Sequence, residues 1–132
     1  METATFNPAG GAITAKATFL GNMVADYEMY LKENNSNLQT TLLQGDNLNP
    51  NDDSVTLPTP IAANNGRRVK LETGFYGNNP SVDKNYKISL QIFQDGKLIG
   101  SAVDQTDPTD PTTQLSGKAQ YSLLFVKLVA KS

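Results

Sequence analysis

The chain contains no cysteine, no histidine and no tryptophan among its 132 residues. Without cysteine no disulfide can form, so packing alone must hold the fold together. Without histidine or cysteine, Ser-His-Asp and Cys-His catalytic sites cannot be built, and the usual zinc ligands are missing. Glycine-rich nucleotide-binding motifs are also absent. We therefore expect a protein that is not an enzyme and has no cofactor, with calcium as the one ion that stays open.

Positive charge is sparse as well. The chain has 11 Lys and Arg against 13 Asp and Glu, a formal net charge of −2, and Arg67-Arg68 is its only pair of adjacent basic residues. Because nucleic-acid-binding proteins normally carry a basic patch, we expect no nucleic-acid partner. No run of 18 apolar residues occurs, so we expect no membrane span.

The first residues, METATFNPAGG, show neither the basic start nor the apolar run of a secretory signal. We therefore expect either a cytoplasmic protein or one exported without a cleaved signal.

Asparagine and threonine are abundant, at 13 residues each. Threonine is β-branched and fits the pleated surface of a sheet, whereas asparagine tolerates the positive φ angles of turns. Long helices depend on residues such as arginine, of which the chain has two. The composition therefore favours strands joined by turns.

Hydrophobic and polar side chains alternate along most of the chain, which is typical of half-buried β-strands. Residues 13–19 show this period of two clearly. Residues 23–33 also fit a helix, because Met23, Tyr27 and Leu31 recur at helical spacing. We favour a strand there, since the alternation continues over more positions and the neighbouring segments alternate too.

The same pattern, interrupted by turn residues, predicts about eight strands and no helix. Asp95-Gly96 fits the tight type I′ turn of a β-hairpin, since glycine accepts positive φ and aspartate tolerates it. Pro58 marks the short segment before it as an edge strand or the end of a strand, because proline cannot donate to a β-ladder. The expected strands cover residues 13–19, 23–31, 38–44, 54–57, 69–75, 86–92, 97–103 and 118–131.

These strands predict an all-β fold, an antiparallel β-sandwich formed by a single domain, 1–132. Long connections between antiparallel strands suggest a Greek key, either immunoglobulin-like or jelly-roll. A closed β-barrel is the alternative. No internal repeat is present, so a solenoid or propeller is not expected.

Two loops are rich in the oxygen ligands that calcium prefers, although neither matches an EF-hand. The first is DQTDPTDPTT at residues 104–113, and the second is GDNLNPNDD at residues 45–53. Asp, Asn and Pro are also common turn formers, and a residue before proline is held extended. We therefore interpret the 104–113 stretch mainly as a rigid, solvated connection. The weak calcium candidates are Asp46, Asp52 and Asp53.

A strand end with an outward tyrosine beside two amides, Tyr76-Gly77-Asn78-Asn79, could bind a sugar. Sugars are recognised by an aromatic ring on one face and by polar groups at the hydroxyls. In the competing interpretation Tyr76 half covers the core, and Arg67 pairs with Glu72 or a loop aspartate rather than with a ligand. The candidate ligand-binding residues are Arg67, Tyr76, Asn78, Asn79, Asp104, Asp107 and Asp110.

The last predicted strand is apolar on both faces, one of which a sandwich normally leaves outside. The second face could contact another chain, because large exposed apolar patches usually mark interfaces. A central strand covered by a loop would explain the pattern equally well. The candidate interface residues are Leu124, Val126 and Leu128, on the opposite face from Tyr121, Leu123 and Phe125.

A cysteine-free, acidic, Asn- and Thr-rich β-domain resembles, in composition alone, many bacterial lectin-like, adhesin-like and phage or virion surface modules. Our first hypothesis is therefore a non-enzymatic binding module that recognises a carbohydrate or cell-surface ligand through its loops. The alternative is a structural module that forms homo-oligomers or assembles with a larger partner through the C-terminal strand. A membrane-active toxin is a weaker alternative. Fold alone does not decide among them.

Overall fold

The computed structural model describes residues 1–48 and 53–132. These residues form nine β-strands and two single-turn 3-10 helices, η1 (Ile61–Asn64) and η2 (Pro111–Thr113). No helix in this described part is long and apolar enough to cross a membrane. The strands are β1 (Glu2–Phe6), β2 (Ile13–Gly21), β3 (Met23–Lys32), β4 (Gln39–Asp46), β5 (Ser54–Thr56), β6 (Arg68–Gly77), β7 (Tyr86–Gln94), β8 (Lys97–Gln105) and β9 (Gln120–Ala130).

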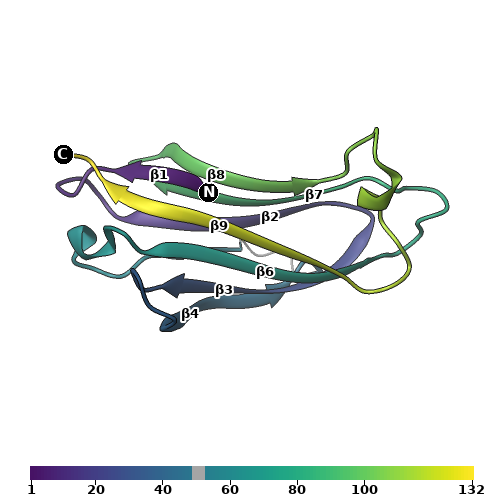
Figure 1. The fold of residues 1–132 in the computed structure, drawn as a ribbon, viewed down its shortest axis with the longest axis horizontal. Helices are drawn as coiled ribbons and strands as arrows, with labels where there is room; N and C mark the ends of the chain where they lie inside the picture. Colours follow the sequence, from purple (N-terminus) through teal and green to yellow (C-terminus); the bar gives the residue numbers. More distant parts are fainter. Residues whose placement is uncertain (49–52) are drawn as a thin grey trace.

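The strands form two sheets that pack face to face (Figure 1). One sheet has five strands in the order β1-β9-β6-β3-β4, and the other has four in the order β5-β2-β7-β8. The chain changes sheet at every connection except the β3–β4 and β7–β8 hairpins. The prediction of an all-β sandwich is confirmed, and the described residues close no barrel.

The sequence pattern missed β1, and it predicted antiparallel pairing throughout. Strand β1 runs parallel to β9, with Ala4 paired to Leu128 and Phe6 to Ala130. Only two of its side chains, Ala4 and Phe6, face the core, which is too short a run to show a period of two. Its pairing with β9 places the C-terminal strand second from the edge of its sheet.

Burial decides between strand and helix for residues 23–33. Along β3, every second side chain from Met23 to Leu31 is buried, and the intervening ones face outward. The break between β2 and β3 falls at Gly21, whose φ of +128° is open mainly to glycine. The strand prediction is therefore confirmed, and its outward residues lie on the exposed face of the five-stranded sheet.

Two smaller predictions are also confirmed. Asp95 and Gly96 both have positive φ, 51° and 74°, as a type I′ turn requires. Strand β5, which ends just before Leu57-Pro58, pairs only with β2 and lies at the edge of its sheet.

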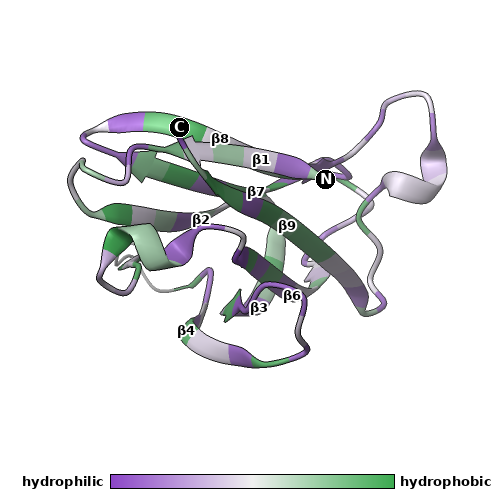
Figure 2. Ribbon diagram, turned by 60° about the vertical axis from the view of Figure 1, so that its left-hand side comes forward, coloured by the Kyte–Doolittle hydropathy of each residue, from purple (hydrophilic) through white to green (hydrophobic). Residues whose placement is uncertain are grey.

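The core fills the space between the two sheets. Figure 2 shows β9, which borders this space, as a mainly hydrophobic strand. Each large apolar side chain buried there contributes about 1.5–3 kcal/mol to folding. The largest fully buried apolar side chains are Phe6, Ile13, Met29, Leu71, Ile88, Leu90, Ile92, Leu128, Val69 and Val126.

Candidate functional site

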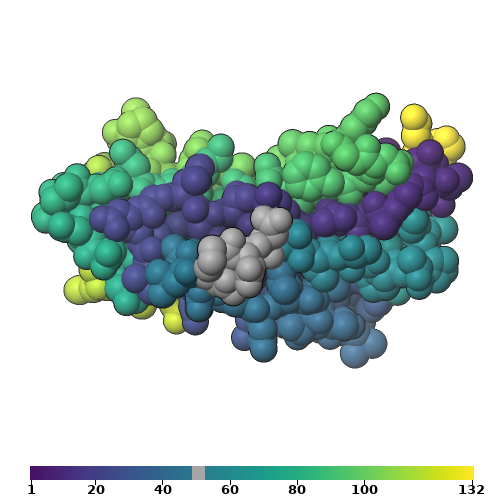
Figure 3. Space-filling view, turned by 180° about the vertical axis from the view of Figure 1, so that it is seen from behind, coloured from purple at the N-terminus to yellow at the C-terminus, as the bar shows by residue number. Residues whose placement is uncertain are grey.

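Six of the seven predicted ligand-binding residues lie at one end of the sandwich. This end is built by the 77–85 and 106–119 segments, which project together (right in Figure 1, left in Figure 3). The Gly77 backbone N–H donates to the Ser116 carbonyl at 2.6 Å, and that of Leu115 donates to the Lys84 carbonyl at 2.9 Å. Arg67 is the exception. It precedes β6 and lies about 30 Å from this end at 3.3 Å per residue.

Arg67 has a structural role at the other end. Its Nε forms an ion pair with Glu33 at 3.0 Å, and its guanidinium also donates to the Asn64 side chain at 3.1 Å. Asn64 is fully buried and donates in turn to the Pro58 carbonyl. The structure therefore separates Arg67 from the other predicted site residues. The pairing with Glu33, rather than with Glu72 or a loop aspartate, was not visible in the sequence.

The DQTDPTDPTT stretch forms two successive turns, each closed by its aspartate. The Asp107 carboxylate accepts hydrogen bonds from the Thr109 backbone and hydroxyl, at 2.9 and 2.7 Å. These bonds hold the pKa of Asp107 below its usual value. Asp110 does the same for Thr112, at 3.0 and 2.7 Å, and caps the short helix η2. Local geometry therefore accounts for both carboxylates.

Two further candidate carboxylates accept hydrogen bonds from tyrosines at the border of the core. The Tyr86 hydroxyl donates to Asp104 at 3.0 Å, and the Tyr27 hydroxyl donates to Asp53 at 2.7 Å. Burial, reinforced by the hydrogen bond to Asp104, raises the pKa of Tyr86 to about 12. Burial and the bond to Asp53 likewise raise the pKa of Tyr27. Asp104 and Asp53 thus satisfy tyrosine hydroxyls.

The two asparagines after β6 also bind neighbouring loops. The backbone N–H of Asn78 donates to the carbonyl of Asn22 at 3.0 Å, joining the β6 end to the β2–β3 bend. The Asn79 side chain accepts from the Ser81 hydroxyl at 2.8 Å. Tyr76, near the end of β6, also lines a groove.

No group of three or more acidic, histidine or cysteine residues able to hold a metal ion occurs within residues 1–48 and 53–132. Asp46 accepts from the backbone N–H of Leu48 at 3.0 Å. Asp52, the remaining calcium candidate, lies outside the described residues.

We expect calcium to leave the melting temperature unchanged. A ligand that binds only the native state must raise it, and the loop carboxylates already accept hydrogen bonds within the protein. Thermal unfolding with millimolar calcium and with a chelator tests this. A calcium-dependent rise in melting temperature would reveal a site and contradict the structural role of these loops.

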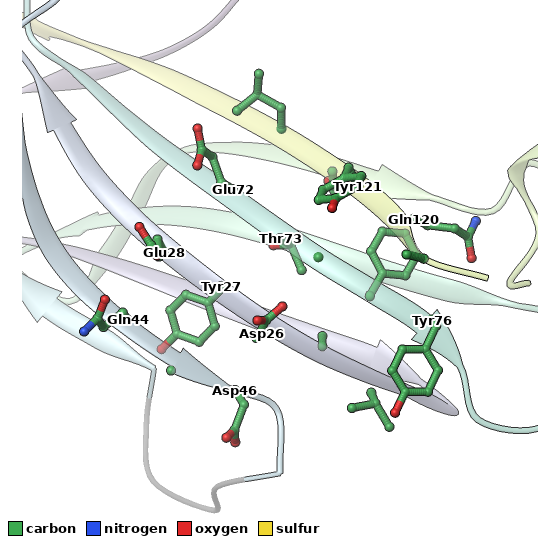
Figure 4. A pocket seen from close by; sticks show the side chains of 18 of the residues that line it. Asp26, Tyr27, Glu28, Gln44, Asp46, Glu72, Thr73, Tyr76, Gln120 and Tyr121 are labelled. Carbon is green, nitrogen blue, oxygen red and sulfur yellow. The ribbon is translucent and has the colours of Figure 1, made fainter. Parts of the chain in front are cut away.

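A large groove lies on the outer face of the five-stranded sheet, away from the loop tips. It has a volume of about 1090 Å³ and crosses β4, β3, β6 and β9 (Figure 4). The outward side chains that line it are mainly acidic, amide-bearing or apolar. They include Asp26, Glu28, Gln44, Asp46, Glu72, Tyr76, Tyr121 and Leu123.

One row across the sheet forms the centre of this groove. Asp46, Asp26, Gly74 and Tyr121 are register partners on four neighbouring strands. Gly74 lets two neighbouring side chains close over its strand, because a Cβ atom on it would lie 3.0 Å from Asp26 Oδ1 and 3.8 Å from Tyr121 Cε1. The Asp26 carboxylate and the Tyr121 ring therefore lie together over Gly74, in space that another residue would need for its own side chain.

Two exposed tyrosines line the groove on this side of the sheet. Tyr121 is 85% exposed and Tyr76 is 45% exposed, and both are outward residues of their strands. The next row holds Glu28, which accepts from the Tyr30 hydroxyl, and Glu72, which forms an ion pair with Lys70 at 3.0 Å. The groove thus combines exposed aromatic surface with several acceptor oxygens.

Sequence reasoning overlooked this surface because it assigned recognition to loops. The alternation of polar and apolar residues did show that Asp26, Glu28 and Glu72 would point outward from their strands. They lie on one face because their two strands are neighbours in the same sheet. Which strands would be neighbours, and hence that Tyr121 would lie beside Gly74, depends on the topology and could not be read from the chain.

The predicted interface residues need correction. Leu124 is 8% exposed, and Val126 and Leu128 are fully buried between the sheets. They cannot contact another chain without opening the sandwich. The outward face of β9 instead carries Tyr121, Leu123 and Phe125, so any surface this strand offers lies on that side.

No protein-family model, curated protein or solved structure matches the chain.

Proposed function

We propose that the protein is a non-enzymatic carbohydrate-binding module whose binding surface is the groove on the five-stranded sheet. The observation that carries the proposal is the groove itself, in which the Asp26 carboxylate and the exposed Tyr121 ring lie together over Gly74. A sugar ring has an apolar C–H face and a belt of hydroxyl donors. An exposed aromatic ring covers the first, and carboxylate oxygens accept from the second.

The position of these groups on strands rather than loops supports binding of a rigid ligand. Asp26 projects from β3, which pairs with a strand on each side, and Tyr121 projects from the part of β9 that pairs with β6. Groups fixed on a sheet lose little conformational entropy when a ligand binds, and so they bind more tightly than the same groups on a mobile loop. We therefore expect recognition on a sheet face instead of the loop tips that the sequence suggested.

The charge of the groove limits which sugars it accepts. Asp26, Glu28 and Asp46 all lie on the same side of the face, and each is exposed. A glycan that carries carboxylate or sulfate groups would place negative charges against these carboxylates. The repulsion would lower its affinity enough to exclude it. Neutral glycans and those with amino groups are therefore the expected ligands.

Tyr121→Ala is expected to lower the affinity for a bound glycan at least about tenfold, because it removes the most exposed aromatic ring of the groove. The free energy of unfolding of the variant should equal that of the wild type, since the side chain is 85% exposed. A glycan array followed by calorimetry measures this. Leu98→Ala, at an exposed residue of β8, is the matched control.

Three outcomes would count against the proposal. The first is an array without any bound neutral or amino glycan. The second is a Tyr121→Ala variant that binds as tightly as the wild type, and the third is a preference for anionic glycans.

A further inference from the structure

The outer face of the five-stranded sheet carries like charges directly opposite one another. Lys32, Arg68 and Lys127 are register partners on three neighbouring strands and form a cationic row. At the groove end, Asp26 pairs in register with Asp46. Like charges placed directly opposite on adjacent strands destabilise a sheet.

A second acidic pair, Glu28 and Glu72, lies between these two rows. The face is therefore divided into an anionic half and a cationic half, about 20 Å apart from row to row at 3.3 Å per residue. Lys70 and Glu72 form their ion pair at the boundary between the halves. This arrangement costs stability in the isolated chain, and a partner with the opposite order of charges would recover it.

Apolar side chains lie across the same boundary. On β9, Leu123 is 56% exposed and Phe125 is partly exposed, and Tyr30 projects from β3. Arg68 lies over the Phe125 ring at 5.8 Å and Lys70 over the Tyr30 ring at 4.7 Å. The centre of the face thus has the apolar character of an interface core, with charged rows at its rim.

We propose that this face binds a second copy of the chain, related by a two-fold axis that lies in the interface and runs across the strands. Such an axis reverses the order of the rows while each strand faces its own counterpart. It sets the cationic row of one copy against the Asp26–Asp46 row of the other, and the Glu28–Glu72 row against the row that holds Lys70. The other in-plane axis, parallel to the strands, would set like charges against like.

The register supports this axis residue by residue. When the axis passes through the face at the level of Leu71, which pairs with Met29, Asp26 faces Lys32 of the second copy. Both residues are three positions from Met29 on β3. By the same symmetry Leu123 faces Phe125 of the second copy.

The Asp26–Tyr121 pair over Gly74 also has a counterpart. Gly74 and Arg68 are each three residues from Leu71 on β6, so the Arg68 side chain of one copy faces Gly74 of the other. There it meets the Asp26 carboxylate and the Tyr121 ring, a suitable setting for a guanidinium.

The size of the face is sufficient for a stable dimer. The five strands comprise 44 residues, which at 4.8 Å by 3.3 Å each cover about 700 Å² per copy, within the range of a specific interface. Because the second copy covers the groove, dimerisation and sugar binding compete. The dimer itself does not depend on whether the ligand is a sugar.

Charge reversal of each half tests the proposal. Asp26→Lys with Glu28→Lys leaves the two acidic rows without net charge, since Asp46 and Glu72 remain in them. Lys32→Glu with Lys127→Glu gives the cationic row a net negative charge, although Arg68 remains in it. Sedimentation equilibrium of the wild type at up to millimolar concentration should give twice the chain mass of 14.2 kDa. Each double variant alone should be monomeric, and an equimolar mixture of the two should restore the dimer.

Lys16→Glu with Lys87→Glu, on the four-stranded sheet, makes the same charge change elsewhere and should leave the dimer intact. Circular dichroism and melting temperature check that all variants fold. A wild type that stays monomeric overturns the proposal, and so do double variants that still dimerise alone or fail to associate when mixed. Lys32→Glu with Lys127→Glu leaves the groove residues intact, so its glycan binding reports on the proposed function separately.

Discussion

Val126→Lys is expected to abolish folding. Val126 is fully buried between the sheets on β9, so the substitution places an ammonium group in the core without a partner. The penalty for an unpaired buried charge is several kcal/mol, and a domain of this size has a total stability of about 5–15 kcal/mol. The variant should lose its β-sheet circular dichroism or unfold at far lower urea than the wild type.

Leu123→Lys is the matched control, three residues earlier on the same strand. Leu123 is 56% exposed on the outward face, where a lysine remains solvated. Its unfolding midpoint in urea should stay close to that of the wild type, while its self-association should weaken. If Val126→Lys folds normally and Leu123→Lys unfolds, the two faces of β9 have been assigned the wrong way round.

Gly100→Val is expected to destabilise the protein by about 3 kcal/mol, the upper part of the range for overpacking. On β8, a Cβ atom at this position would lie 2.7 Å from Ala4 Cβ, 2.8 Å from Ala4 Cα and 2.8 Å from the Thr3 carbonyl. The obstacle includes the backbone of β1, which cannot turn aside as a flexible side chain can. Strand β1 must therefore move away from β8.

Urea unfolding measures the loss of stability, and amide hydrogen exchange locates it. The amides of Glu2–Phe6 should exchange faster in Gly100→Val than in the wild type, and more so than those of β7. Gly117→Val, at a glycine with no atom within 4 Å of the added Cβ, should have no such effect. Unchanged exchange in β1 would show that the two strands do not approach as closely as described.

The strands themselves could be predicted because their side chains alternate visibly. Residues 13–19, 23–31 and 86–92 each place four or more hydrophobic side chains on one face, and each forms a strand. The Asp95-Gly96 hairpin could be predicted because both residues accept positive φ. These are local properties of the chain.

The remainder depends on which strands become neighbours. The parallel pair of β1 and β9 joins the two ends of the sequence, and no local pattern announces it. The same holds for the groove, which combines Asp26 with Tyr121 across three strands. For β9 the sequence showed two apolar faces but could not say which one the sandwich would bury.

We propose that this protein binds its partners through the outer face of the five-stranded sheet. Hydroxyl-radical footprinting at low and high protein concentration tests it most directly. We expect oxidation of Tyr121 and Leu123 to fall as the protein concentration rises, while oxidation of Leu98 and Val103 on β8 stays constant. Constant oxidation at Tyr121 and Leu123, or protection at Leu98 and Val103 instead, would contradict it.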